Sequence, residues 1–287
     1  MSEYLRPQSM NEALSYLAET RATIAAGCTD LFAATGRRDL TGPVLDVTAI
    51  EGLRGITASG AGLCFGAATT WGDVIRADLS PAFDMLKEAA REVGSVQIQN
   101  AGTIAGNICN ASPAADGVPC LVALDAQVTL ASQSGARVLP LAGFLTGPRQ
   151  TDLRADEMVV SIDVPRSAMS GRSRFLKLGA RRYLVISIAM VAVRLTVEAG
   201  KVSDVAIGVG ACGPVARRMA ALEEALLGRS VGDMDMDILD LVTEGMVAPA
   251  LAPIDDIRAA AGYRTHAAVE LIRRALADLL FATEGAA

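Results

Sequence analysis

The residues best suited to chemistry lie in one stretch of small side chains, AGTIAGNICNASPAAD, at residues 101–116. Glycine, hydroxylated and amide side chains let a ligand approach the backbone closely and meet N–H donors. Asp116 adds one carboxylate, which suits sugar hydroxyls better than phosphate. On local chemistry alone, a glycine-rich turn between two buried elements explains the stretch equally well. The candidate contacts in it are Thr103, Ile104, Gly106, Asn107, Asn110, Ser112 and Asp116.

A second small-residue loop follows the strand expected at Thr23–Ala26 and leads into a short helix from Leu31. A strand, a glycine turn and a helix start together aim backbone N–H groups and the helix dipole at an anion. A simple helix N-cap at Thr29 or Asp30 is the alternative interpretation. The candidate contacts in this loop are Ala26, Gly27, Cys28, Thr29, Asp30 and Leu31.

A third glycine pattern is rejected as a dinucleotide site. Residues 208–213, GVGACG, fit G-x-G-x-x-G between an expected strand and an expected helix. A Rossmann site would also need a second parallel strand that ends in an acidic residue about 20 positions on, and the sequence predicts a helix there. Pro214 removes one of the N–H groups that would face a pyrophosphate. We therefore expect a helix-entry turn. No P-loop is present either, because no Lys-Ser/Thr follows the glycines at 102 and 106.

Histidine and cysteine usage excludes several kinds of redox and hydrolytic site. His266 is the only histidine, which leaves no histidine-based metal cage and no Ser-His-Asp triad. The five cysteines match no iron–sulfur spacing and form no disulfide framework. Any redox chemistry must therefore come from an organic cofactor, with the protein supplying position and electrostatics.

Composition predicts a soluble, cytoplasmic protein with two domains. The 287 residues are 51% hydrophobic, but no apolar run is long enough to cross a membrane, and the N-terminus lacks the features of a signal peptide. The formal net charge of -6 offers no attraction for nucleic acid or for anionic membranes. Unpaired cysteines suit a reducing compartment.

The helices and strands that position the two loops are expected to form two domains. The predicted boundary between these domains is a polar segment, residues 165–174. Residues 1–169 are expected to form one domain of two α/β lobes, about 1–55 and 56–169. Capping boxes at Ser9 and Thr70 predict helix starts there, and Trp71 is expected in the core. Residues 170–287 are expected to form the second domain. Strands are predicted there at Arg174–Lys177, Ile188–Val197 and Val202–Val209, and helices at Val215–Leu227, about Asp233–Val247 and Thr265–Phe281.

Four sequence blocks resemble one protein family in the same order along the chain. GTIAGN with ASPAAD and ALDA, AAGCTDL at 25–31, FLKLGARR at 175–182 and PIDDIRAAAGYR at 253–264 are similar to the FAD-binding subunit of the molybdenum hydroxylases, the xanthine dehydrogenase and carbon monoxide dehydrogenase group. The resemblance implies an α+β fold. A two-lobed α/β FAD-binding domain (PCMH/VAO-like) is followed by a smaller domain of three-stranded antiparallel sheet plus helices.

The resemblance also implies a function and a set of partners. The chain would be an oxidoreductase subunit that takes electrons from [2Fe–2S] clusters and passes them from FAD to an external acceptor. Molybdopterin and the clusters would lie on a molybdenum-binding large subunit and a [2Fe–2S] small subunit, in a hetero-oligomer such as a dimer of heterotrimers. A stand-alone flavin oxidase and a cofactor-free assembly subunit are the alternatives.

Site roles are carried over by matching position. Gly27–Asp30 with Thr103, Gly106 and Asn107 would hold the pyrophosphate of a non-covalently bound FAD. Asp116 would bind ribityl hydroxyls, and Lys177 would reach the polar edge of the flavin ring. The chain departs from the family at Cys28, where a glycine is usual, and at Gln99, where an arginine is frequent. Residues 181–184, RRYL, replace an acidic version found in xanthine dehydrogenases.

Overall fold

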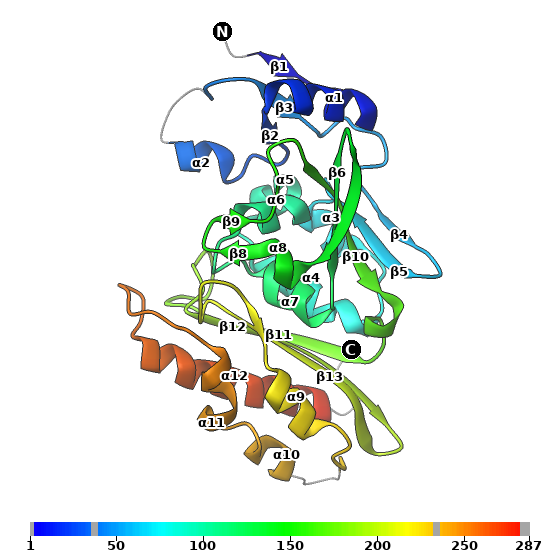
Figure 1. Cartoon of the computed structure of the whole chain (residues 1–287). Helices are drawn as coiled ribbons and strands as arrows, with labels where there is room; N and C mark the ends of the chain where they lie inside the picture. The colour runs from blue at the N-terminus through cyan, green and yellow to red at the C-terminus, as the bar shows by residue number, and fades with distance from the viewer. Residues whose placement is uncertain (1–2, 36–39, 232–235, 282–287) are drawn as a thin grey trace.

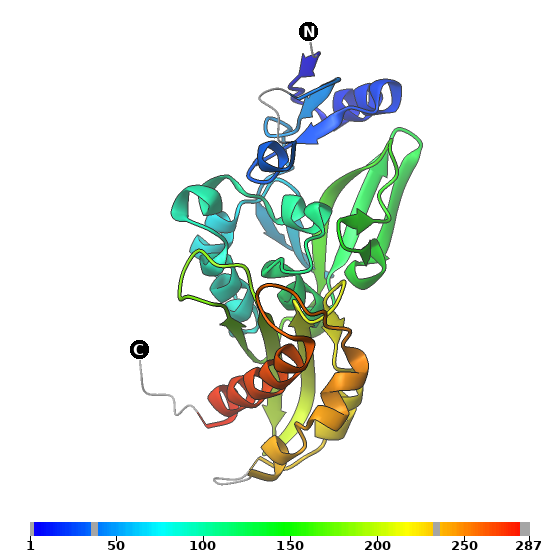
Figure 2. The same cartoon turned by 90° about the vertical axis from the view of Figure 1, so that its left-hand side faces the viewer.

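A computed structural model of the chain describes residues 3–35, 40–231 and 236–281. Two lobes and a sheet-and-helix domain follow one another along the long axis of the molecule (Figures 1 and 2). The N-terminal lobe contains β1 (Tyr4–Leu5), α1 (Met10–Thr20), β2 (Thr23–Ala25), α2 (Leu31–Thr35) and β3 (Val44–Asp46). Its strands form a parallel sheet of order β1-β3-β2. As predicted, α1 begins after Ser9, whose hydroxyl accepts a hydrogen bond from the N–H of Glu12.

The middle lobe is built on a five-stranded antiparallel sheet. Its strands are β4 (Ile56–Ala58), β5 (Gly62–Gly66), β6 (Gln127–Ser132), β7 (Gly135–Pro140) and β10 (Met158–Pro165), in the order β4-β5-β10-β6-β7. The helices are α3 (Trp71–Arg76), α4 (Asp84–Glu92), α5 (Val96–Ala101), α6 (Ile104–Asn110), α7 (Gly117–Ala123) and α8 (Leu141–Phe144). A small β8–β9 hairpin, Leu145–Gly147 and Gln150–Thr151, packs against two helices of this lobe, α6 and α8.

The capping box predicted at Thr70 is complete. The Thr70 hydroxyl accepts from the N–H of Asp73, and the Asp73 carboxylate accepts from the N–H of Thr70. These two bonds start α3 and bury Trp71 in the core, as predicted. The position of α3 matters because Trp71 packs directly under the N-terminus of α7, where Gly117 leaves room for its ring.

The C-terminal domain contains the three predicted antiparallel strands, β11 (Arg172–Leu178), β12 (Ala189–Glu198) and β13 (Lys201–Gly210). A fourth strand of two residues, β14 (Arg217–Arg218), pairs with β13. The helices are α9 (Ala220–Leu226), α10 (Met236–Asp240), α11 (Glu244–Val247) and α12 (Ala261–Phe281). The helix predicted from Val215 was wrong in its first five residues, because pairing with the edge of β13 outweighs helix propensity there. The start of the helix predicted at about Asp233 lies outside the described residues.

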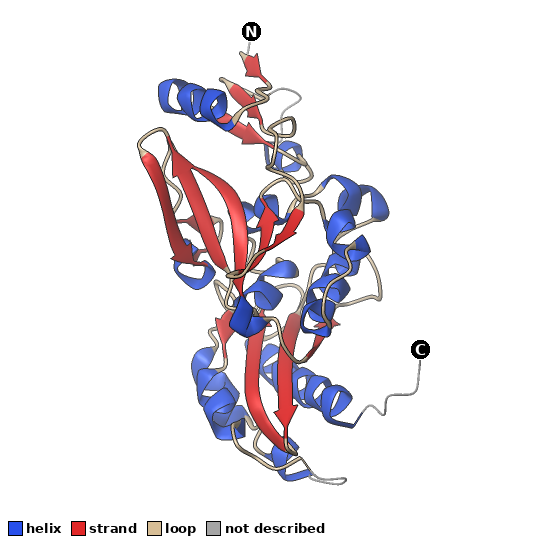
Figure 3. Ribbon diagram, turned by 90° about the vertical axis from the view of Figure 1, so that its right-hand side faces the viewer, coloured by secondary structure: helices blue, strands red, loops and turns tan. Residues whose placement is uncertain are grey.

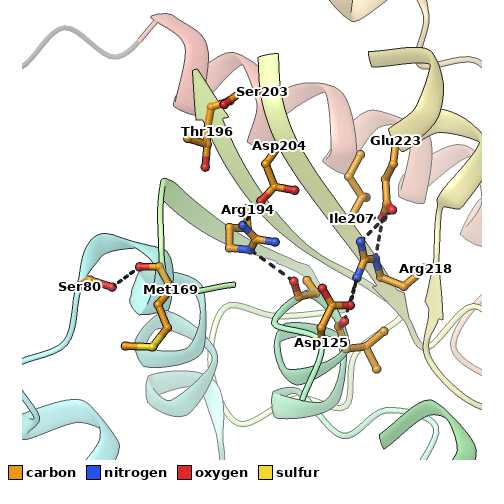
Figure 4. A network of polar contacts seen from close by, with 12 residues as sticks. Ser80, Asp125, Met169, Arg194, Thr196, Ser203, Asp204, Ile207, Arg218 and Glu223 are labelled. Atoms are coloured by element: carbon orange, nitrogen blue, oxygen red, sulfur yellow. Dashed lines mark hydrogen bonds and ion pairs between the residues drawn. The ribbon is translucent and has the colours of Figure 1, made fainter. Parts of the chain in front are cut away.

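Helices cover both faces of this C-terminal sheet (Figure 3). One face packs against α9 and α12, and the other packs against α4 and α7 of the middle lobe. The strand β12 is therefore buried on both sides. Ala189 and Val191 join the core under α12, whereas Met190 and Ala192 join the core of the middle lobe. Polar contacts with α7 and the turn after it reinforce the contact. Arg218 pairs with Asp125 (Figure 4) and donates to the carbonyl of Val122.

The rejected G-x-G-x-x-G segment lies in the antiparallel sheet. Gly208 and Gly210 are part of β13, and Gly208 allows that strand to approach the backbone of Pro119 in α7. The turn after it leads into β14 before α9 begins, rather than directly into a helix. No parallel strand follows within the described part of this domain, so the glycines serve packing.

Candidate functional site

A cavity of about 710 Å³ lies where the two lobes meet the C-terminal domain. Its size is typical of a small-molecule or cofactor site. Every residue that the sequence predicted for the site lines it, except Ile104 and Lys177. Ile104 is fully buried in the core, and Lys177 lines a neighbouring cavity of about 570 Å³. The lining residues that had been predicted are Ala26, Gly27, Cys28, Thr29, Asp30, Leu31, Thr103, Gly106, Asn107, Asn110, Ser112 and Asp116.

The two glycine loops touch each other at the wall of this cavity. A Cβ atom on Gly27 would lie 2.6 Å from the carbonyl carbon of Ala101 and 2.8 Å from the Cα of Gly102, and closer still to the Ala101 oxygen. Real Cβ atoms do not approach backbone atoms so closely. Gly27 is therefore required for contact between the two loops. From the sequence alone, this glycine was explained only by the close approach of a ligand.

Cys28 adopts a left-handed backbone conformation, with φ of 56°. A Cβ makes this conformation costly by about 1–2 kcal/mol, so a glycine would adopt it with less strain. The thiol donates to the carbonyl of Ala26 at 3.4 Å. Burial raises the pKa of the thiol above its ordinary value, so it is a poor nucleophile at neutral pH.

Replacing Cys28 by glycine is expected to give a more stable protein than replacing it by alanine. Cys28→Gly and Cys28→Ala both lose the thiol, but only glycine removes the Cβ penalty. We expect the glycine variant to be more stable than the alanine variant by about 1 kcal/mol. Denaturant unfolding of both variants measures this difference. Equal stabilities would show that the left-handed angle carries no penalty here.

The second loop begins α6 and leaves one polar atom without a partner. The hydroxyl of Thr103 accepts from the N–H of Gly106 at 3.0 Å, and the N–H of Ile104 donates to the carbonyl of Thr69 at 2.9 Å. These two N–H groups are engaged within the protein and are not available to a ligand. The side-chain oxygen of Asn107, which lines the cavity, is buried without a hydrogen-bond partner. Such an acceptor costs about 1–3 kcal/mol until a donor reaches it.

Asp116 and Lys177 form an ion pair where the C-terminal domain meets the cavity. Lys177 Nζ lies 2.8 Å from Asp116 Oδ2, and their side chains are only 7% and 10% exposed. The hydroxyl of Ser187 donates to Asp116 Oδ1 at 2.7 Å. Burial raises the pKa of Asp116, while Lys177 and the Ser187 hydroxyl oppose this rise. Both carboxylate oxygens thus already have protein partners, and each keeps a free lone pair for a ligand hydroxyl.

Several lining residues were missed by the sequence reasoning. Leu184–Ile186, from the loop between β11 and β12, reach the cavity from the C-terminal domain. Arg149, in the β8–β9 turn, donates to the side-chain and backbone oxygens of Asn110 at the end of α6. No local sequence signal marks either segment, because each reaches the cavity through the folding of the chain. Gln99, by contrast, donates to the carbonyl of Arg91 on α4.

Cys109 is a second thiol in the lining of the cavity. Burial raises its pKa to about 12, so the protonated thiol dominates at neutral pH. Within the described residues, no group of three or more His, Cys, Asp or Glu side chains is arranged to hold a metal ion. Nor is any helix in this part of the chain long and apolar enough to cross a membrane.

The fold and cavity define a two-lobed cofactor-binding domain attached to a sheet-and-helix domain. Residues 1–167 match the family model described as the FAD binding domain in molybdopterin dehydrogenase, and residues 174–279 match the CO dehydrogenase flavoprotein C-terminal domain. The chain therefore belongs to the flavoprotein family of the molybdopterin dehydrogenases. The family and α+β fold predicted from the sequence are confirmed.

Relatives match over nearly the whole chain. The glyceraldehyde dehydrogenase medium chain of Sulfolobus acidocaldarius is 29% identical, over 96% of this chain and 97% of the relative. The carbon monoxide dehydrogenase medium chain of Hydrogenophaga pseudoflava is also 29% identical, over 96% and 95%. Among solved structures, the carbon monoxide dehydrogenase of that organism superposes with a TM-score of 0.87 at 30% identity, covering 98% of this chain and 97% of the other.

Proposed function

We propose that this chain is the FAD-binding electron-transfer subunit of a multi-subunit molybdenum hydroxylase. The observation that carries the proposal is the cavity between the two glycine loops, with the partnerless oxygen of Asn107 in its wall. FAD carries ribose and ribityl hydroxyl groups, which are donors of the kind that this oxygen lacks. The residues present therefore fit the cofactor that gives the family its description.

The two loops and the buried ion pair would hold the cofactor. The backbone of Gly27–Asp30, with Thr103 and Asn107, would contact its pyrophosphate and sugar. Asp116 would accept hydrogen bonds from ribityl hydroxyls, and Lys177 would place a cation near the ring. When bound, FAD supplies the capacity to take up and release electrons. A nearby ammonium group stabilises added negative charge, so Lys177 would raise the reduction potential of the bound flavin.

The proposed assembly follows from relatives that are named as medium chains and FAD-binding subunits. We expect a molybdenum-binding large subunit and a [2Fe–2S] small subunit as partners, arranged as a dimer of heterotrimers in the cytoplasm. We also propose that residues 1–169 and 170–287 are the two domains of this subunit. Electrons would then enter from the cluster-bearing partner and leave to an external acceptor.

The first experiment measures the cofactor. Purified chain should show a flavin absorption spectrum, and acid precipitation should release all of the FAD, because a non-covalent cofactor leaves with the unfolded chain. Gly106→Leu should abolish binding in a folded protein. Its Cβ would meet the Thr103 hydroxyl at 2.8 Å, and the rest of the side chain would extend from a residue that lines the cavity. Flavin retained in the washed pellet, or full FAD content in folded Gly106→Leu, would contradict the assignment.

The second experiment measures turnover. The isolated chain should accept electrons from an artificial donor, but it should not oxidise aldehydes, N-heterocycles or carbon monoxide by itself. Adding the molybdenum and iron–sulfur subunits should restore hydroxylation. Sustained oxidation by the single chain, with molybdenum and iron shown to be absent, would make it an independent flavin oxidase. A folded chain with no affinity for FAD would instead make it an assembly subunit.

A further inference from the structure

Arg264 is a buried cation whose side chain donates its hydrogen bonds to chain segments outside its own helix. It lies in the first turn of α12 and is 2% exposed. Its Nη1 donates to the carbonyls of Ile188 at 2.7 Å and Ala211 at 3.1 Å, and its Nη2 donates to Asp256 at 2.6 Å. Its Nε is buried without a partner. A buried arginine with an unpaired donor is a costly way to stabilise a core, since an apolar side chain of similar volume often serves as well.

The two carbonyls that Arg264 holds belong to two segments of the C-terminal domain that hydrogen-bond to the small-residue stretch. Next to Ile188, the fully buried Ser187 donates to Asp116 in the cavity wall. The other segment makes its contact through Ala211 itself, whose N–H donates to the carbonyl of Pro113 at 3.0 Å. Arg264 therefore joins two of the hydrogen-bonded contacts between the C-terminal domain and residues 112–116, the pair of Lys177 with Asp116 being another.

Ile188 also closes the loop that lies over the cavity. Its N–H donates to the carbonyl of Leu178 at 2.8 Å, which joins the ends of the loop at residues 179–187. Leu184–Ile186 of that loop line the cavity. With its N–H bound to Leu178 and its carbonyl bound to Arg264, Ile188 is fixed on both sides. Release of the carbonyl would loosen the loop and Ser187 together.

We propose that Arg264 is a positioning residue of the cofactor site. By fixing the carbonyls of Ile188 and Ala211, it holds Ser187 against Asp116 and keeps the 179–187 loop over the cavity. Its effect on FAD binding rests on the proposed function, whereas its effect on the loop does not. Asp256, which accepts from Arg264 and from Arg258, keeps the guanidinium in place.

A second buried arginine in the same domain provides a matched control. Arg194 on β12 is also 2% exposed, and it pairs with Asp204 and contacts the carbonyl of Ala123 (Figure 4). It lines a separate cavity of about 290 Å³ that includes none of the residues of the candidate site. Arg194→Lys should lower the melting temperature without altering the loop or the affinity for FAD.

The test compares Arg264→Lys with Arg194→Lys in the full chain. Lysine keeps the charge but cannot bridge Ile188, Ala211 and Asp256 together, because it lacks the planar fork of donors. Hydrogen exchange of the peptide spanning residues 179–188 should become at least tenfold faster in Arg264→Lys and stay unchanged in Arg194→Lys. The Kd for FAD should rise about tenfold in Arg264→Lys alone.

A double-mutant cycle with Ser187→Ala separates positioning from general stability. If Arg264 holds Ser187 in place, the double variant should raise the Kd for FAD by no more than Arg264→Lys does alone. Additive effects of the two substitutions on the Kd would overturn the proposal. So would an Arg264→Lys protein that is less stable but keeps the wild-type Kd and the wild-type hydrogen exchange of residues 179–188. If Arg264→Lys does not fold, Asp256→Asn applies the same exchange measurement with a milder change. Wild-type protein that fails to bind FAD would contradict only the proposed function. Hydrogen exchange of the peptide spanning residues 179–188 would still test the role of Arg264.

Discussion

Replacing Gly27 by alanine is expected to weaken FAD binding and to destabilise the protein. The added methyl group would overlap the backbone of Ala101 and Gly102, and backbone atoms cannot move aside as a flexible side chain can. Overpacking of this kind costs about 3 kcal/mol. The two glycine loops must separate to relieve it, and the cavity wall that they share is then distorted. We expect the affinity for FAD to fall by about 100-fold, measured by flavin fluorescence titration.

Gly60→Ala is the matched control for that substitution. Gly60 has no heavy atom within 4 Å of an added Cβ, and its backbone is not left-handed. The control should therefore bind FAD as the wild type does and unfold at a similar denaturant concentration. Wild-type affinity in Gly27→Ala would mean that contact between the loops is not needed for the site.

The second large effect is expected at the buried ion pair. Lys177→Met leaves the Asp116 carboxylate buried without its cation, and removing one partner of such a pair costs about 3–5 kcal/mol. The pKa of Asp116 is already raised by burial, and loss of Lys177 removes the charge that lowers it. Denaturant unfolding near pH 8 should show the full loss of stability.

The same loss should shrink as the pH falls. Between the ordinary pKa of 3.8 and the raised pKa in the folded state, the folded protein holds more protons than the unfolded chain. Stability of Lys177→Met therefore decreases as pH rises through that window. Unfolding at pH 5 and pH 8 measures the difference, and a flat pH dependence would contradict the burial of an unpaired carboxylate.

Two further variants complete this test. Asp116→Asn combined with Lys177→Met removes both charges, and it should recover most of the stability near pH 8. Arg274→Met removes an exposed pair with Glu270 on α12 and should change stability little, because solvent screens that pair. A double variant as unstable as Lys177→Met would show that packing of the lysine stem, rather than charge, dominates.

The sequence by itself determined the local elements and the composition of the two loops. The capping box at Thr70 and the strands β12 and β13 depend on residues close together in the chain, so local patterning was sufficient to predict them. Rejection of the G-x-G-x-x-G segment needed only Pro214 and the helix pattern within about 20 positions of it. The loops at Gly27 and Gly106 could be recognised from the sequence, because a run of small side chains indicates a backbone that a ligand can approach closely.

Only the tertiary structure decided how these parts meet. Lys177 and Ser187 reach Asp116 across 61 and 71 positions of sequence, and Arg264 reaches Ile188 across 76. Pairings over such distances depend on the path of the whole chain, whereas local propensity acts over three or four residues. The same reason explains β14, which forms because the edge of β13 is available to it. It also explains Gly27, a loop residue whose neighbour Ala101 lies at the end of α5 and leaves no space for a side chain.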